Sequence, residues 1–331
     1  MNGSKMVLFI TGKCGTDCFY CPISPAKKDK DVMYANERKI SMLEEMIEEA
    51  ESMDATGTGI TGGDPLCVMD RTVEAIKMLK DRFGKDHHIH LYTSVVDREK
   101  TRALAEAGLD EIRFHPPMSQ WETMSFAEIS DIVKETTLDV GMEVPAIPGN
   151  KDKLERLVTA ASEAGVKFIN VNEFEFSESN WNMMEGIGFR VKDDLSSAVA
   201  GSEEMTIELM KKNPECPIHF CSSTFKDGVQ LRKRLIRRAN VISKKYDVVT
   251  EDGTILKGVV YADDLDKAAA DLASLRVPND LMFIDRERKR IEVASWRLKK
   301  VSKKLPYFSY IIEEYPTFDR MEVERIPLPH K

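Results

Sequence analysis

Short apolar segments alternate with amphipathic segments over the first two thirds of the chain. The apolar segments are rich in β-branched residues, whereas the amphipathic ones repeat apolar residues at every third or fourth position. We predict strands at residues 7–11, 57–61, 88–93, 111–115, 139–144 and 167–172. We predict helices at residues 38–53, 70–83, 98–107, 125–136, 151–164 and 202–212. This alternation indicates repeated βα units around a parallel sheet.

The predicted fold class is therefore α/β, and two architectures fit the pattern. One is an open doubly wound sheet, and the other is an incomplete barrel. The periodicity alone does not separate them. In both architectures a ligand site lies at the C-terminal ends of the strands.

The chain changes character after residue 212. A polar and aromatic segment at 216–221 leads to a basic helix candidate at 223–245, a hairpin candidate at 246–261 and a helix candidate at 265–275. Residues 1–215 hold 25 basic and 39 acidic side chains, whereas residues 216–331 hold 23 and 17, within a net charge of −8. We expect one domain at residues 6–212 and a smaller mixed α+β module at residues 213–331.

The composition is that of an ordinary globular protein, with 42% hydrophobic and 31% charged residues. No apolar segment approaches the roughly 18 residues that a membrane-spanning helix needs. The N-terminal residues show no signal-peptide pattern. We therefore expect a cytoplasmic protein without a membrane partner.

Three of the six cysteines lie close together directly after the first predicted strand. Cys14, Cys18 and Cys21 form a C-x3-C-x2-C spacing. Thiolates on so short a loop can surround one compact soft-metal centre, such as an iron–sulfur cluster. Three ligands on a four-iron cluster would leave one iron open. A zinc site is the alternative, although structural zinc sites use four ligands, often in paired C-x2-C units.

A glycine-rich turn follows the second predicted strand. It consists of Gly62, Gly63, Asp64 and Pro65. The glycines allow the backbone to approach a ligand closely or to adopt a positive φ, and the proline has no N–H to donate. Carbonyl groups exposed by such a turn suit a bound ammonium group.

The cysteine spacing, with Tyr20 as the aromatic residue before the last cysteine, resembles the signature of the radical S-adenosylmethionine superfamily. The resemblance implies a partial (β/α)6 barrel and a [4Fe–4S] cluster on the three cysteines, with S-adenosylmethionine on the open iron and Tyr20 beside this site. An external one-electron donor of the ferredoxin or flavodoxin type would reduce the cluster. The cofactor would then be cleaved to methionine and a 5′-deoxyadenosyl radical that abstracts hydrogen from the substrate.

The same resemblance extends to the glycine-rich turn and to later strand ends. The turn is similar to the family's GGEP-like motif, which receives the methionine amino group, with Asp64 in place of the more usual Glu. Thr93 and Ser94 match the polar segment that meets the nucleoside, with Ser94 in place of the usual Asn.

Three titratable residues close later strands and are candidate catalytic groups. His115, Glu143 and Glu173 end the fourth, fifth and sixth predicted strands. Carboxylates that converge at one barrel mouth need a cationic or hydroxylated ligand to offset their repulsion. For His115 the alternative is a structural role, satisfied by neighbouring backbone.

The remaining cysteines and the basic helix candidate have more than one interpretation. Cys67, Cys216 and Cys221 could ligate an auxiliary cluster, or they could be free buried thiols. The helix candidate at 223–245 could contact RNA phosphates, carry an acidic peptide, or form a solvated or intramolecular face. We expect the last of these.

Residues 61–66 and 170–175 resemble short sequence segments of uncharacterised archaeal proteins related to pyruvate formate-lyase activating enzymes. The substrate stays open among a peptide or protein, a cofactor precursor and RNA. The alternative function is a non-catalytic iron–sulfur or zinc-binding protein with a redox or structural role. Metal analysis separates the enzyme from the non-catalytic protein. About four irons per chain would support the enzyme, and about one zinc per chain would support the binding protein.

Overall fold

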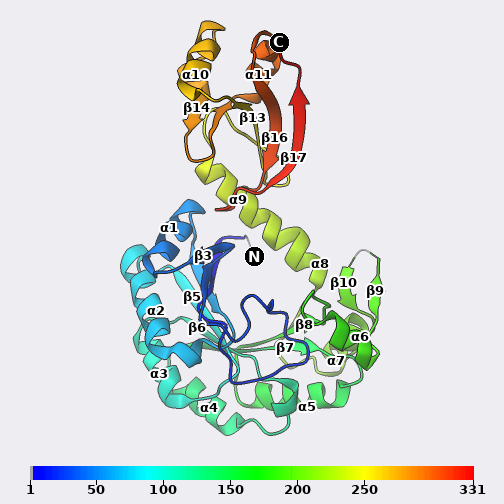
Figure 1. Cartoon of the computed structure of the whole chain (residues 1–331). Coiled ribbons are helices and arrows are strands. Elements are labelled where there is room, and N and C mark those ends of the chain that lie inside the picture. Colours follow the sequence, from blue (N-terminus) through cyan, green and yellow to red (C-terminus); the bar gives the residue numbers. More distant parts are fainter. Residues whose placement is uncertain (1–2, 195) are drawn as a thin grey trace. The chain divides into compact units, whose positions relative to one another are not determined.

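The computed structural model describes residues 3–194 and 196–331, and the chain divides into two units (Figure 1). The barrel unit contains residues 5–50 and 55–229. The C-terminal unit contains residues 230–331 together with the short segments 3–4 and 51–54. Residues 213–229, which we expected in the C-terminal module, are part of the barrel unit.

A curved nine-stranded sheet forms the barrel unit. Its strands, in chain order, are β1 (Lys5–Phe9), β2 (Met33–Ala35), β3 (Arg38–Ile40), β4 (Gly57–Thr61), β5 (His88–Thr93), β6 (Glu111–Phe114), β7 (Asp139–Ala146), β8 (Phe168–Glu173) and β11 (Ile218–Cys221). Their spatial order is β11-β8-β7-β6-β5-β4-β1-β2-β3. In this order, each strand from β11 to β1 pairs in parallel with its neighbour. The β2–β3 hairpin adds two antiparallel strands beyond β1.

The strand order decides between the two predicted architectures. A doubly wound sheet reverses direction at a switch point, so that its first strand lies in the middle. Here each parallel strand lies beside the next one along the chain, from β1 through β4, β5, β6, β7 and β8 to β11. The chain therefore winds in one direction, as in a barrel, and the predicted partial barrel is confirmed, with β11 as an additional parallel strand.

Helices cover the outer side of this sheet (Figure 1). They are α1 (Glu44–Ser52), α2 (Met69–Phe83), α3 (Arg98–Glu106), α4 (Phe126–Glu135), α5 (Lys151–Glu163) and α7 (Ser202–Lys212). Side-chain caps mark two of their starts, since Asp97 accepts a hydrogen bond from the backbone of Lys100 and Ser125 accepts one from Glu128. Gly84 and Gly165 adopt positive φ where α2 and α5 end.

Alternate residues of β1 point to opposite sides of the sheet. Met6 and Leu8 are fully buried beneath the outer helices, whereas Val7 faces the inner side and is 41% exposed. Solvent therefore reaches the inner, concave side of the partial barrel. Polar side chains of β5 to β8 line this side.

One predicted helix begins later than expected. Residues 38–53 carry a helical pattern, but Arg38–Ile40 forms β3, which pairs with β2. The Glu45 carboxylate accepts hydrogen bonds from the backbone N–H groups of Ser41 and Met42, at 2.7 and 3.0 Å. These bonds satisfy N–H groups at the helix start, so that α1 begins only at Glu44.

An insertion follows β8 and was not predicted. It contains α6 (Trp181–Ile187) and a two-stranded sheet of β9 (Val191–Asp193) and β10 (Ser196–Val199). After β11 come α8 (Ser223–Phe225) and a π-helical segment, Lys226–Leu231. The predicted basic helix therefore corresponds to α8, this π-helical segment and α9 (Arg232–Ile242), which follow one another directly.

The C-terminal unit is a mainly antiparallel module. Its strands are β12 (Val248–Val249), β13 (Ile255–Tyr261), β14 (Met282–Asp285), β15 (Arg290–Val293), β16 (Phe308–Glu314) and β17 (Glu322–Leu328). β12 and β13 form the predicted hairpin. Helices α10 (Leu265–Ser274) and α11 (Ser295–Val301) bury Leu272 and Leu298 in a core with Val260 and Ile291.

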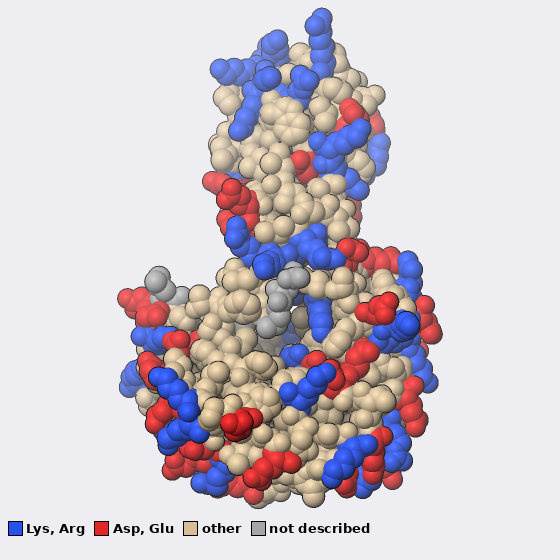
Figure 2. Space-filling view, turned by 180° about the vertical axis from the view of Figure 1, so that it is seen from behind, with Lys and Arg blue, Asp and Glu red and all other residues tan. Residues whose placement is uncertain are grey.

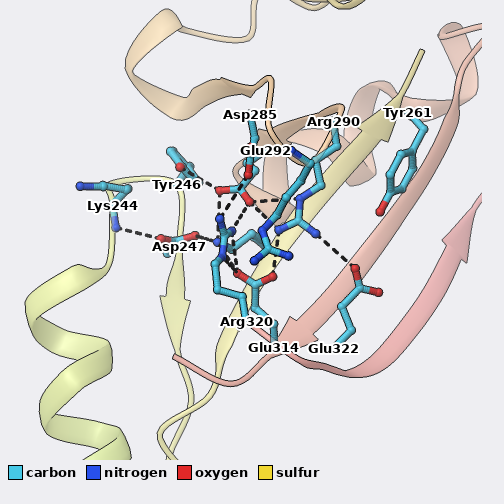
Figure 3. Close-up of polar contacts among 12 residues, drawn as sticks. Lys244, Tyr246, Asp247, Tyr261, Asp285, Arg290, Glu292, Glu314, Arg320 and Glu322 are labelled. Atoms are coloured by element: carbon cyan, nitrogen blue, oxygen red, sulfur yellow. Dashed lines mark hydrogen bonds and ion pairs between the residues drawn. The ribbon is translucent and has the colours of Figure 1, made fainter. Parts of the chain in front are cut away.

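Buried charges lie at the other side of this sheet (Figure 3). Lys257, only 4% exposed at its side chain, places Nζ 3.2 Å from both Asp247 and Glu292 and 2.9 Å from Glu314. Arg290 also bonds to Glu292 and Glu314, at 2.6 and 2.9 Å. The carboxylates are thereby paired with cations inside the module.

Among the described residues, each helix is too short or too polar to span a bilayer.

Candidate functional site

The loop that carries the three cysteines lies along the turn that follows β4. The N–H of Gly63 donates to the carbonyl of Thr11, at 2.7 Å, and the N–H of Asp64 donates to that of Lys13, at 2.8 Å. The cysteines follow Lys13 directly. The end of β4 therefore fixes where the cysteine loop begins.

Close packing between these two loops requires the glycines of the turn. A Cβ at Gly63 would overlap the carbonyl oxygens of Lys13 and Gly12, and one at Gly62, which has a φ of +157°, would overlap that of Thr11. Within the described residues, the carbonyl oxygens of Gly62 and Gly63 themselves accept no hydrogen bond. The turn thus presents two free acceptors, which fit the predicted ammonium group.

The cysteines lie close to one another, and each is partly exposed. The hydroxyl of Thr16 lies between two of them, 3.2 Å from the sulfur of Cys14 and 4.0 Å from that of Cys18. Burial raises the pKa of the Cys18 thiol, although hydrogen bonds with Tyr20 and Thr16 act in the opposite direction. Three accessible soft donors on one loop fit three corners of an iron–sulfur cluster.

A site for a single metal ion, such as the zinc site given as the alternative, needs its ligands closer together than a four-iron cluster does. In the described part of the chain, no three His, Cys, Asp or Glu side chains are grouped so that they could hold one ion. In a four-iron cluster each cysteine binds its own iron, so its thiolates lie farther apart than the ligands of one ion.

The insertion after β8 supports the cysteine loop from a second side. Asn180, which is 3% exposed, donates from Nδ2 to the carbonyl of Tyr20 at 3.1 Å. Ser179 donates from its hydroxyl to the carbonyl of Cys21 at 3.2 Å. Sequence reasoning missed both residues. The only local signal is the pair Ser177 and Asn180, whose side chains bond to each other's backbone N–H groups in a short turn.

Tyr20, predicted to lie beside the cofactor, is largely buried. Its ring packs against Phe19 and Phe174, and its hydroxyl accepts a hydrogen bond from the backbone of Met118 at 3.2 Å. Burial raises the pKa of its phenol. The contacts of Tyr20 thus support the cysteine loop, and its contact with a cofactor stays a prediction.

Asp64, Thr93 and Ser94 lie together, and the Asp64 carboxylate joins them. It accepts hydrogen bonds from the Thr93 hydroxyl (2.9 Å) and from the backbone N–H (2.8 Å) and hydroxyl (2.7 Å) of Ser94. The backbone of Leu66 donates to its other side, at 3.0 Å. Asp64 is buried, so its carboxylate fixes the turn after β4 to the end of β5.

Glu143 faces the concave side of the sheet and is surrounded by donors. Its carboxylate accepts hydrogen bonds from Arg113 at 3.0 Å, Asn170 at 3.1 Å and Asn172 at 2.9 Å. Arg113 also donates to the hydroxyl of Tyr92 at 2.8 Å. The polar lining of the barrel is therefore an ordered network, and sequence reasoning missed Asn170 and the role of Arg113.

Glu173 lies on the opposite side of β8 from Asn170 and Asn172, because alternate residues of a strand face opposite sides. It is buried, and its carboxylate accepts a hydrogen bond from the backbone N–H of Ser223 at 2.9 Å and binds Lys192 at 3.3 Å. The structure does not bring Glu173 together with Glu143. Glu173 connects β8 to the start of α8 and to the insertion.

His115 follows β6 and is half-buried. Its backbone N–H donates to the carbonyl of Thr93 at 2.7 Å, which places it next to the end of β5. A catalytic role for its ring stays a prediction.

The other cysteines are not assembled into one group. Cys67 follows the turn after β4 and is exposed, so it is not a buried thiol. Cys221 ends β11, with β5 to β8 between β4 and β11 in the sheet. An auxiliary cluster on Cys67, Cys216 and Cys221 is therefore not supported.

The basic side chains of α9 bind within the C-terminal unit. Arg232 donates to the carbonyl of Glu251 at 2.8 Å, and Arg237 donates to that of Met53 at 2.9 Å. Arg238 is buried and bonds to Ser52. These contacts agree with the expected intramolecular role of the basic helix.

Comparison with known proteins gives matches over both units. Residues 8–172 match the family described as the radical SAM superfamily, SAM being S-adenosylmethionine, and residues 253–328 match a domain of unknown function, DUF8061. A protein of Methanocaldococcus jannaschii, provisionally named a glycyl-radical enzyme activating enzyme, is 42% identical over 343 aligned positions, which cover 99% of this chain and 91% of the relative.

Solved structures give lower similarity. SuiB of Streptococcus suis, bound to S-adenosylmethionine, is 12% identical with a TM-score of 0.46 over 65% of this chain, which spans about half (49%) of SuiB. Methylornithine synthase is 16% identical with a TM-score of 0.43 over 64% of this chain, and 63% of the synthase is covered.

Proposed function

Since this chain belongs to the radical S-adenosylmethionine superfamily, we propose that Cys14, Cys18 and Cys21 hold a [4Fe–4S] cluster. With one electron from an external donor, this cluster would supply the reductive cleavage of S-adenosylmethionine to methionine and a 5′-deoxyadenosyl radical, which would abstract hydrogen from a substrate. The observation that carries the proposal is the contact between the cysteine loop and the glycine-rich turn. Hydrogen bonds hold the two loops together, and the turn keeps two carbonyl acceptors free where the cysteine loop begins.

The residues around this contact have distinct roles in the proposal. The carbonyls of Gly62 and Gly63 accept hydrogen bonds from the amino group of the methionine moiety. Asp64 keeps the turn in place through Thr93 and Ser94. Since the Asp64 carboxylate is already occupied by donors, it acts as a positioning residue.

We propose a polypeptide as the substrate, in line with the name of the Methanocaldococcus jannaschii relative. The concave side of the barrel is open to solvent at Val7, so an extended chain segment can enter. Asn170 and Asn172 donate to Glu143 through Nδ2, and in the described part of the chain their Oδ1 atoms are not hydrogen-bonded. These oxygens can accept hydrogen bonds from peptide N–H groups.

Anaerobic reconstitution tests the chemistry. The loaded protein should hold about four irons and four sulfides per chain. With dithionite and S-adenosylmethionine it should form 5′-deoxyadenosine, and a Cys18→Ala variant should form none. A fully loaded wild-type protein that forms no 5′-deoxyadenosine would overturn the proposal, and about one zinc per chain would support the non-catalytic binding protein.

Isotope transfer tests the substrate class. An extract of source cells grown on deuterated amino acids is separated into a protein fraction, an RNA fraction and a small-molecule filtrate. Each fraction is incubated with the reduced enzyme, and deuterium in 5′-deoxyadenosine is measured by mass spectrometry. Transfer from the protein fraction, lost after protease treatment, supports a polypeptide. Transfer only from the filtrate or from RNA contradicts it.

A further inference from the structure

The outer face of α11 and of the 3-10 turn after it, Ser302–Lys304, carries a dense group of exposed cations. We call it the α11 patch, and its members are exposed side chains within nine residues of the chain: Trp296, Arg297, Lys299, Lys300, Lys303 and Lys304. Figure 2 shows Lys and Arg gathered over one end of the C-terminal unit, whereas basic and acidic side chains are interspersed over the barrel unit.

The cations of the α11 patch are not neutralised within the protein. Among the described residues, none of the five makes an ion pair or a side-chain hydrogen bond. Cations inside the same unit are paired, as Lys257 is with Glu314 and Arg290 with Glu292. Other exposed lysines of the unit, such as Lys233, Lys244 and Lys267, also lack ion pairs with the residues that the structure describes, but they are far apart in the chain. The density of unpaired cations therefore distinguishes the α11 patch.

Packing of α11 fixes the orientation of these cations. Leu298, Ser302 and Leu305 are buried on the inner side of the segment, and Leu298 lies directly against the backbone of Gly258 in β13. The outer side is left with like charges one helical turn apart, such as Lys299 and Lys303, which repel each other. A bound polyanion would remove that repulsion.

An anionic membrane and an acidic protein both fit this face poorly. Insertion into an anionic membrane requires a helix with a free apolar side, but the apolar side of α11 is used by the core of the module. Specific protein interfaces are enriched in Arg and aromatic residues and depleted in Lys. In the α11 patch four of the five cations are lysines.

Aromatic side chains among the cations indicate what the polyanion contains. Trp296 is 41% exposed at the start of the patch, and Phe308, which follows it, is 61% exposed and contacts the ring of His330. Unpaired bases stack on such rings while Lys and Arg contact the phosphates. Since unpaired bases are typical of RNA loops and ends, we propose that the α11 patch binds single-stranded RNA. This inference goes beyond the proposed function, and RNA binding needs no cluster.

Fluorescence anisotropy with a labelled 20-nucleotide single-stranded RNA tests the proposal on the full chain. The logarithm of the wild-type binding constant should fall linearly with the logarithm of the salt concentration. The variant K299Q/K300Q/K303Q should bind more weakly, and its salt slope should be smaller by about 2. The matched control K233Q/K244Q/K267Q removes three exposed lysines elsewhere in the same unit and should bind like wild type.

A Trp296→Ala variant separates stacking from charge. It should weaken binding roughly tenfold and leave the salt slope unchanged, because it removes a stacking surface and no cation. Circular dichroism verifies that each variant is folded. The proposal would be overturned if the control variant lost as much binding as the patch variant, or if duplex RNA bound equally well. It would also be overturned if polyglutamate or vesicles with anionic lipid bound in place of RNA.

Discussion

Nδ2 of Asn180 donates a hydrogen bond of 3.1 Å to the carbonyl oxygen of Tyr20, a residue 160 positions earlier in the chain. The bond joins the segment between Cys18 and Cys21 to the insertion after β8. Because the other end of the cysteine loop is fixed to the turn after β4, the cysteines lie between two supports.

Replacement of Asn180 should therefore loosen the cluster. In Asn180→Asp the side chain keeps its shape but cannot donate, so a carboxylate faces the carbonyl of Tyr20. Loss of this buried bond should cost about 1–3 kcal/mol of local stability. We expect less iron per chain after gel filtration and a broadened electron paramagnetic resonance signal of the reduced cluster.

Ser179→Ala is the milder variant for comparison, since it removes the half-buried hydroxyl that donates to the Cys21 carbonyl and contacts Ser177. It should keep most of its iron. Full iron content and an unchanged resonance signal in Asn180→Asp would show that the insertion does not position the cluster.

Gly63→Ala should prevent cluster assembly while the barrel still folds. The added methyl group would overlap the carbonyl oxygens of Gly12 and Lys13 and push the cysteine loop away from β4. Gly186→Ala is the control, because Gly186 lies in α6 with open space around its Cβ position, where alanine favours the helix. Iron analysis and circular dichroism check both variants, and normal iron loading of Gly63→Ala would contradict the packing argument.

Asp64→Asn should destabilise the barrel unit. All groups around this carboxylate are donors, and an amide places an N–H₂ group against some of them. Hydrogen bonds to a charged acceptor contribute about 1.5–3 kcal/mol each, so we expect a loss of that order in urea unfolding. Thr93→Val, which removes one donor, should cost less. The opposite ranking would argue against Asp64 as the centre of this network.

Lys257→Met should destabilise the C-terminal unit strongly. It leaves Asp247, Glu292 and Glu314 close together without their shared cation. Breaking a buried ion pair from one side costs about 3–5 kcal/mol. Urea unfolding at neutral pH should show this loss, and lower pH should reduce it as the carboxylates become protonated. A variant as stable as wild type at neutral pH would rule out a paired role for Lys257.

Glu292 should make the C-terminal unit sensitive to acid. Burial alone would raise its pKa, but Lys257, Arg320 and Arg290 lower the pKa to about 2, below the ordinary 4.5. A lowered pKa in the folded state stabilises the fold above pH 4.5, and this contribution is lost as the pH falls from there to about 2. The loss should be on the order of 3 kcal/mol.

The unfolding free energy of wild type and Glu292→Gln, followed from pH 6 to pH 2, isolates this effect. Asp247 acts in the opposite direction, because burial raises its pKa and it favours the fold more at low pH. Because Asp247 is present in both proteins, the difference in unfolding free energy between wild type and Glu292→Gln reports on Glu292 and should shrink as the pH falls. The unfolding free energy of Glu324→Gln, which changes an exposed residue, should follow that of wild type. A constant difference over this range would be inconsistent with the lowered pKa.

The barrel could be predicted from the sequence because its strands are short and apolar and its helices are regular. The strands at residues 57–61 and 88–93 coincide with β4 and β5. The β2–β3 hairpin was missed because Arg38–Ile40 continues the helical pattern of the next segment. The strand β17 was missed because most of it is exposed and it alternates little.

The site was predictable only where its residues are neighbours in sequence. The cysteine spacing and the glycine-rich turn are local, and both lie where expected. The contact of Asn180 with Tyr20 spans most of the barrel and leaves no local pattern. The turn that contains Asp64 was expected at the cofactor, whereas the burial of the Asp64 carboxylate among donors follows from the pairing of β4 with β5, which no local pattern specifies.

The composition of the C-terminal unit decides which residues a transplanted copy of it must include. The matched domain covers only residues 253–328, while the unit also uses residues 51–54. Arg237 binds the Met53 carbonyl and Asp54, and Arg238 binds Ser52. Residues 253–328 alone contain neither of these arginines and none of these partners. Transplanting the domain with these contacts to another barrel therefore requires helix α9 and the segment before β4 as well.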